Sequence, residues 1–180
     1  RNLHAFPSRP TSDLQACRLQ FSCQVGQELN RDYTPSPVRQ FQSLISNSNN
    51  ELQGPDEFAS LTKTHFEEVV AEVYAVYQRR LQQANAMDFD DLIMKTVEVL
   101  QRFPESKARF RSRFRHVLVD EYQDTNHAQY ILIRELVGND VEGIPAAELC
   151  VVGDADQSIY GFRGATIRNI LQFELDFPNA

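Results

Sequence analysis

The sequence predicts an α/β fold with a parallel sheet, preceded by a mostly helical part. Two short apolar runs, residues 117–119 and 149–152, are rich in β-branched side chains and have the length of buried strands. Between them, residues 125–137 carry apolar side chains at helical spacing. Because a strand, a helix and a second strand follow one another, the helix should cross over and leave the two strands parallel.

The chain upstream of these strands has helical periodicity. Residues 55–84 carry apolar side chains at spacings of three and four, which predicts one long amphipathic helix. A second helix is expected after Asp88, which pairs with Asp91 in the pattern of a capping box. It should end at Phe103-Pro104, because a residue before proline disfavours helix. Its expected buried stripe consists of Leu92, Ile93, Val97 and Leu100.

These patterns place a domain boundary near residue 115. Residues 1–114 are predicted to form a mostly helical domain and residues 115–180 an α/β part, with a last helix over about 165–173. Residues 1–55 are polar and mix helix-like with loop-like stretches. Two strands are too few for an independent sheet, so at least one more strand is expected from elsewhere.

Composition excludes several classes of protein. With 180 residues, 42% hydrophobic and 24% charged, the chain is typical of a soluble globular protein. It has no run of about 20 apolar residues and no apolar core of a secretory signal in residues 1–10. Three scattered cysteines, Cys17, Cys23 and Cys150, favour a reducing, cytoplasmic setting over disulfides or zinc. The net charge of −7 disfavours nucleic acid unless a local site binds it.

The first candidate site follows the first strand. Asp120 and Glu121 stand directly after Val117-Leu118-Val119. Ligands of open α/β sheets bind outside the carboxyl ends of the strands. A carboxylate there suits Mg²⁺, and the adjacent Glu121 is placed to polarise an attacking water. The alternative is a strand end that simply enters a solvated turn.

The second candidate site follows the second strand, in residues 153–164. It offers an amide in Gln157, aromatic rings in Tyr160 and Phe162, and a fixed cation in Arg163. Rings that stack on bases and an arginine that holds phosphate suit single-stranded nucleic acid. The alternative is that the rings pack inward and Arg163 pairs with a carboxylate.

Taken together, the two sites resemble a known family. Residues 119–126 (VDEYQDTN) and 151–165 (VVGDADQSIYGFRGA) resemble motifs II and III of superfamily 1 helicases of the UvrD/PcrA/Rep family, and residues 87–92 (MDFDDL) look like another of its elements. The resemblance is closest from about residue 55 onward. It implies a partial RecA-like P-loop NTPase sheet in residues 115–180, similar to domain 1A. Residues 1–114 would correspond to the helical insertion, domain 1B.

The resemblance also implies roles. Asp120 would hold the Mg²⁺ of MgATP, Glu121 would be the general base for the hydrolytic water, and Gln157 would sense the γ-phosphate. The track for single-stranded DNA would include Tyr160, Phe162 and Arg163. Many relatives carry tryptophan at the position of Phe162 and a basic residue at Gly161, so stacking is retained here while one phosphate contact is lost.

The phosphate-binding loop of the family is missing. No Gly-x-x-x-x-Gly-Lys-Ser/Thr occurs in the chain. We therefore expect a middle segment of an ATP-dependent DNA helicase, acting 3′ to 5′ on single strands and at duplex junctions, that is inactive by itself. The alternatives are a subunit of an AddA/RecB-type helicase–nuclease and a non-catalytic DNA-binding module.

Other polar residues have simpler interpretations. Asp124 or Thr125 is expected to cap the helix that follows. The four histidines show no ligand spacing. A basic run is more typical of a solvated face than of a DNA contact; it consists of Lys107, Arg109, Arg111, Arg113 and Arg115.

Overall fold

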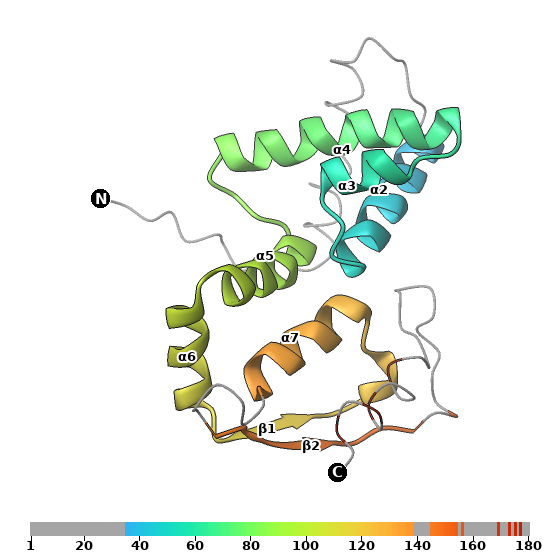
Figure 1. The fold of residues 1–180 in the computed structure, drawn as a ribbon. Helices are drawn as coiled ribbons and strands as arrows, with labels where there is room; N and C mark the ends of the chain where they lie inside the picture. The colour runs from blue at the N-terminus through green and yellow to red at the C-terminus, as the bar shows by residue number, and fades with distance from the viewer. Residues whose placement is uncertain are drawn as a thin grey trace. The chain divides into compact units, whose positions relative to one another are not determined.

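The computed structural model describes residues 35–138 and 145–154, together with Asp156, Asn169, Phe173, Leu175 and Phe177. Its elements, shown in Figure 1, are α2 (Pro35–Asn50), α3 (Pro55–Leu61), α4 (His65–Gln83), α5 (Phe89–Arg102), α6 (Pro104–Arg113), β1 (His116–Val119), the 3₁₀ turn η1 (Tyr122–Asp124), α7 (His127–Val137) and β2 (Glu148–Val151). Among the described residues, no helix is both long and apolar enough to cross a bilayer.

The chain divides into two compact units. The first comprises the described part of Arg1–Ser46 together with Gly54–Ala86, and the second comprises Asn47–Gln53 and the described part of Met87–Ala180. This division does not test the predicted domain boundary near residue 115, which stays a prediction.

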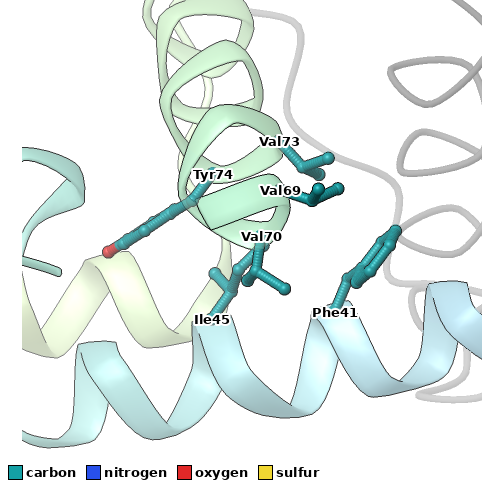
Figure 2. Packing of buried hydrophobic residues seen from close by; sticks show 6 residues of the cluster. All are labelled: Phe41, Ile45, Val69, Val70, Val73 and Tyr74. Carbon is teal, nitrogen blue, oxygen red and sulfur yellow. The ribbon is translucent and has the colours of Figure 1, made fainter. Parts of the chain in front are cut away.

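The core of the first unit lies between α2 and α4. Phe41 and Ile45 of α2 point toward α4, as Figure 2 shows. The α4 side of this core consists of Val69, Val70, Val73 and Tyr74. These positions recur at spacings of three and four, so one face of α4 is buried along two turns. Burial of this apolar face is the main stabilising contribution to the unit.

The prediction of one long helix over 55–84 is wrong, because α3 ends at Leu61 and α4 begins at His65. The side chain of Thr64 accepts a hydrogen bond from Glu67 N at 3.2 Å. The Glu67 carboxylate in turn accepts from the backbone N–H groups of Lys63 at 2.7 Å and Thr64 at 2.9 Å. This capping box starts a new helix, although the apolar spacing continues across the break.

The capping box predicted for α5 is confirmed. Asp88 Oδ1 accepts from Asp91 N at 2.8 Å, and Asp91 Oδ2 accepts from Asp88 N at 3.2 Å. Both carboxylates are thus used by the helix start. Val97 and Leu100 are buried as expected, but Leu92 is 47% exposed. Leu92 lies outside the buried face of α5, although its neighbour Asp91 is buried.

An additional helix, α6, starts where α5 was expected to stop. Pro104 occupies its first turn, where a missing N–H costs nothing. Three arginines of the basic run, at 109, 113 and 115, are exposed. The solvated-face interpretation is wrong for Lys107 and Arg111. Lys107 pairs with the carboxylate of Glu135 at 3.0 Å, and Arg111 is only 7% exposed.

The predicted parallel strands are confirmed in the second unit. β1 and β2 pair in parallel with His116 opposite Glu148 and Val119 opposite Val151. Helix α7 connects them and lies along the strand pair (Figure 1). The half-buried strand residues are Val117, Val119, Leu149 and Val151, and they alternate with exposed ones. The mixed helical fold with a small parallel sheet therefore agrees with the α/β prediction.

The predicted cap of α7 is wrong by one or two residues. Asn126 is the N-cap: its side chain accepts from Gln129 N at 2.9 Å, and Gln129 Oε1 accepts from Asn126 N at 3.0 Å. Asp124 lies in η1. Thr125 instead donates from Oγ1 to Tyr122 O at 2.7 Å, so its hydroxyl closes the turn and does not cap the helix.

The last predicted helix, over about 165–173, lies outside the described residues except for Asn169 and Phe173, both of which are helical. Asn169 is buried and donates from Nδ2 to Thr125 O at 2.8 Å. The ring of Phe173 packs edge-on against Tyr122, with 5.5 Å between centroids. Both contacts reach the segment that follows β1.

Candidate functional site

The carboxyl ends of β1 and β2 are joined by backbone hydrogen bonds. Val152 N donates to Val119 O at 2.8 Å, and Tyr122 N donates to Val152 O at 3.0 Å. The two strands that were predicted to be parallel therefore end next to each other. The polar residues that follow the two strands therefore lie at the same edge of the sheet. Ligands of parallel α/β sheets bind at this edge.

Asp120 is the first residue after β1 and is exposed. Its Oδ1 accepts the backbone N–H of Glu121 at 2.9 Å. This local bond orients the carboxylate at the end of the strand. A carboxylate held in this way, at the rim of the sheet and open to water, has the character of a ligand for a hydrated divalent cation.

Glu121 has left-handed backbone geometry, with φ 51° and ψ 43°. A residue with a Cβ adopts this conformation at a cost of about 1–2 kcal/mol. Its main-chain oxygen accepts from Asp124 N at 2.9 Å, so the strained residue turns the chain from β1 into η1. Strained backbone of this kind occurs at sites whose surroundings enforce one geometry.

The carboxylate of Glu121 has a partner that the sequence analysis missed. Gln123 Nε2 donates to Glu121 Oε2 at 2.7 Å. The Gln123 side chain is only 1% exposed, although Glu121 itself is exposed. In the sequence, a glutamine in a turn after a strand is expected to face solvent. The only sign of a role for Gln123 was its place within the run Asp-Glu-Tyr-Gln-Asp.

The same glutamine also contacts the loop after β2. Gln123 Oε1 accepts the backbone N–H of Asp154 at 2.9 Å. Asp154 Oδ1 accepts from Asp156 N at 3.0 Å, a bond within the same loop. Thus Glu121, from the segment after the first strand, and Asp154, from the segment after the second, meet on one buried amide.

The remaining predicted site residues lie outside the described part of the chain. These are Gln157, for the γ-phosphate, and the residues predicted to contact DNA, which are Tyr160, Phe162 and Arg163. Of the predicted site, the structure thus describes Asp120 and Glu121.

The donor set around the strand ends limits the kind of metal that would fit. Within the described ranges, no group of three or more His, Cys, Asp or Glu side chains is arranged to hold a metal ion. An all-protein cage for zinc or calcium would need such a group. Mg²⁺ is commonly held by one or two carboxylates, with water and phosphate oxygens completing the shell, and Asp120 fits that requirement.

Comparison with known proteins identifies the family. The family profile described as "UvrD/REP helicase N-terminal domain" matches residues 8–178, which is nearly the whole chain. The chain belongs to the UvrD/REP helicase family. The expected resemblance, based on the residues after the two strands, is therefore confirmed.

Several curated members of the family are similar to this chain. "ATP-dependent DNA helicase UvrD1" of Mycobacterium tuberculosis (strain ATCC 25618 / H37Rv) is 60% identical over 159 residues, covering 86% of this chain and 21% of the relative. The Mycobacterium leprae protein of that name is 52% identical over 162 residues, covering 86% and 21%. "ATP-dependent DNA helicase PcrA" of Bacillus subtilis (strain 168) is 45% identical over 153 residues, covering 85% and 20%. The chain thus spans about a fifth of the length of these relatives.

Proposed function

We propose that this chain is the segment of an ATP-dependent DNA helicase that carries the carboxylates for nucleotide hydrolysis. The observation that carries the proposal is the Asp120-Glu121 pair at the joined ends of two parallel strands. Family membership and the names of the relatives support it. The parallel pair β1–β2 with its crossover helix α7 would then belong to a partial RecA-like domain, residues 115–180. Residues 1–114 would form the helical insertion.

In this proposal the two carboxylates have different tasks. Asp120, oriented by the backbone N–H of Glu121, would hold Mg²⁺, which neutralises phosphate charge when MgATP is bound. Glu121 would accept a proton from the attacking water. Its carboxylate is exposed, so water can reach it, and it accepts a hydrogen bond from Gln123 Nε2.

Residues beyond Asp154 would complete the site. Gln157 would contact the γ-phosphate. The single strand would lie against Tyr160, Phe162 and Arg163. Aromatic rings that stack on bases and an arginine that pairs with phosphate suit this task. The substrate would be single-stranded DNA and its junctions with duplex, traversed 3′ to 5′.

Residues 1–180 alone would be inactive in ATP hydrolysis. The chain contains no Gly-x-x-x-x-Gly-Lys-Ser/Thr loop, and hydrolysis depends on groups that hold the β- and γ-phosphates. Purified residues 1–180 should therefore show no DNA-stimulated phosphate release, even when nucleotide and DNA are in excess.

The deciding experiment replaces Glu121 by Gln in the intact protein. We expect DNA-stimulated phosphate release to fall below detection, because the proton acceptor is lost, while binding of a non-hydrolysable ATP analogue is retained. Glu105→Gln, an exposed carboxylate on α6, is the matched control and should keep full activity. Undiminished phosphate release in Glu121→Gln would contradict the proposal. An intact wild-type protein that binds DNA without hydrolysing ATP would point to a non-catalytic module.

A further inference from the structure

The buried amide of Gln123 contacts both segments of the candidate site. Its Nε2 donates to Glu121 Oε2 at 2.7 Å, and its Oε1 accepts from Asp154 N at 2.9 Å. Being 1% exposed, it has no access to bulk water that could replace either bond. Both bonds are therefore expected to be maintained together.

Chemistry fixes which end of the amide faces which partner. A backbone N–H only donates, so the group near Asp154 must be the carbonyl oxygen of Gln123. An ionised carboxylate only accepts, so the group near Glu121 must be the NH₂. A flipped amide would oppose donor to donor and acceptor to acceptor. The orientation of Gln123 thus follows from its partners.

Close backbone approach makes this arrangement possible. A Cβ at Gly153 would lie 2.6 Å from Gln123 Oε1 and 3.2 Å from Tyr122 N. Both distances are below ordinary contact, so a side chain at this position would push the loop after β2 away from η1. The absence of a side chain at Gly153 lets Asp154 N reach the amide.

Glu121 needs such a restraint. Its backbone is in the left-handed region and its side chain is exposed, so the carboxylate is open to water. A general base must be held within hydrogen-bond reach of the water that it deprotonates. The bond from Gln123 Nε2 to Glu121 Oε2 restricts the movement of the carboxylate.

We propose that Gln123 is a positioning residue that holds Glu121 for proton abstraction and ties its position to the loop after β2. This inference rests on the proposed function, in which Glu121 is the base. A shift of the loop at Asp154 pulls on the carbonyl end of the amide, and the amide end moves the carboxylate.

The test compares Gln123→Met and Gln123→Asn in the intact protein. Methionine keeps the length and removes both bonds. Asparagine keeps an amide but is one methylene too short to reach Glu121 and Asp154 together. Gln101→Met, an exposed glutamine on α5, is the matched control. For each protein, nucleotide-binding sites are counted by titration with a non-hydrolysable ATP analogue, and kcat for DNA-stimulated phosphate release is expressed per binding site.

We expect both Gln123 variants to lose about 10- to 100-fold in kcat, because misplacing a catalytic group by about 1 Å has an effect of that order. The KM for ATP and the affinity for the analogue should stay within about twofold of wild type. Gly153→Ala should lower kcat in the same way from the opposite side of the contact. A purely structural glutamine would instead reduce the number of binding sites and leave kcat per site unchanged.

The outcomes separate the two proposals. If Glu121→Gln is inactive while both Gln123 variants keep wild-type kcat per site, the positioning role is wrong and the proposed function stands. If Glu121→Gln is fully active, the proposed function itself fails. Loss of analogue binding in parallel with kcat in the Gln123 variants would also overturn the positioning role, because the amide would then support the nucleotide site as a whole.

Discussion

Arg111 donates a hydrogen bond from Nε to the main-chain oxygen of Glu135, 2.9 Å away. This bond connects α6 to the last turn of α7, and the Glu135 carboxylate pairs with Lys107 on the same side of α6. A basic run that the sequence suggested to be solvated thus contributes two residues to the helix packing of the second unit. The helix α7 held in this way carries the connection between β1 and β2.

Replacing Arg111 by Ala is expected to lower the free energy of unfolding by about 1–3 kcal/mol, because a partly buried carbonyl oxygen loses a donor and the buried Arg111 side chain loses its packing. Chemical denaturation of the intact protein, followed by far-UV circular dichroism, measures the change. Arg113→Ala, an exposed arginine in the same helix, should shift the transition by less than about 0.5 kcal/mol. Equal effects of the two substitutions would show that the Arg111 contact is not stabilising.

Gly138→Ala is expected to destabilise for two reasons. Gly138 has φ +75°, and a Cβ there would lie 2.7 Å from Arg111 Cζ. The clash involves a side chain, whereas the backbone, with φ 75° and ψ −166°, has a conformation that is nearly confined to glycine and costs about 1–3 kcal/mol for a residue with a Cβ. The double variant Arg111→Ala/Gly138→Ala should therefore recover part of the loss but not all of it. If the two single changes in free energy simply add up in the double variant, a clash between the new Cβ at position 138 and the Arg111 side chain is ruled out.

Acid should weaken the start of α4. Backbone N–H groups of Lys63 and Thr64 hold the pKa of the Glu67 carboxyl below its usual range. Because the pKa of Glu67 is lower in the folded state, its carboxylate stabilises the fold at pH values above the pKa that Glu67 has in the unfolded chain. This stabilisation is lost as pH falls through the folded-state pKa. Amide hydrogen exchange in the first turn of α4, corrected for intrinsic rates, should therefore accelerate on acidification in wild type and change less in Glu67→Gln. Identical pH dependence in both proteins would contradict this account.

Glycine at position 121 is expected to be more stable than alanine at that position. Both substitutions remove the carboxylate, but only glycine adopts the left-handed backbone of this residue without strain. Glu121→Gly should exceed Glu121→Ala in free energy of unfolding by about 0.5–1 kcal/mol, as measured by denaturation of the two intact proteins. Both should lack hydrolytic activity. A more stable alanine variant would mean that the turn relaxes when the side chain is shortened.

Local patterns predicted those parts of the fold that depend on neighbouring residues. The capping box of Asp88 and Asp91 and the two strand segments were predicted correctly, because each is encoded within a few residues. The break before Thr64 was missed, although Thr64 and Glu67 show the pattern of a cap, because apolar spacing continues through it. Periodicity alone does not distinguish one long helix from two consecutive helices.

The candidate site divides in the same way. Asp120 and Glu121 could be proposed from the sequence, because two carboxylates directly after a strand are visible there. Gln123 could not, because its role depends on Asp154, which approaches only after β1 and β2 have paired. A contact between segments far apart in the chain produces no periodic pattern in the sequence. The left-handed backbone of Glu121 likewise arises from the turn into η1. It could not be predicted, because the residue at this position is not a glycine.

The parallel pairing of β1 and β2 also has a consequence for the order of folding. Each strand is only four residues long, and the whole of α7 separates them in the chain. Closing such a loop costs chain entropy before any strand pairing compensates for it. By contrast, α5 and α6 are separated only by Phe103 and contact each other locally. Helix formation should therefore precede sheet formation. The contact of Gln123 with both Glu121 and Asp154 then forms among the last steps, so slow or failed strand pairing during synthesis would yield a helical protein without the proposed site.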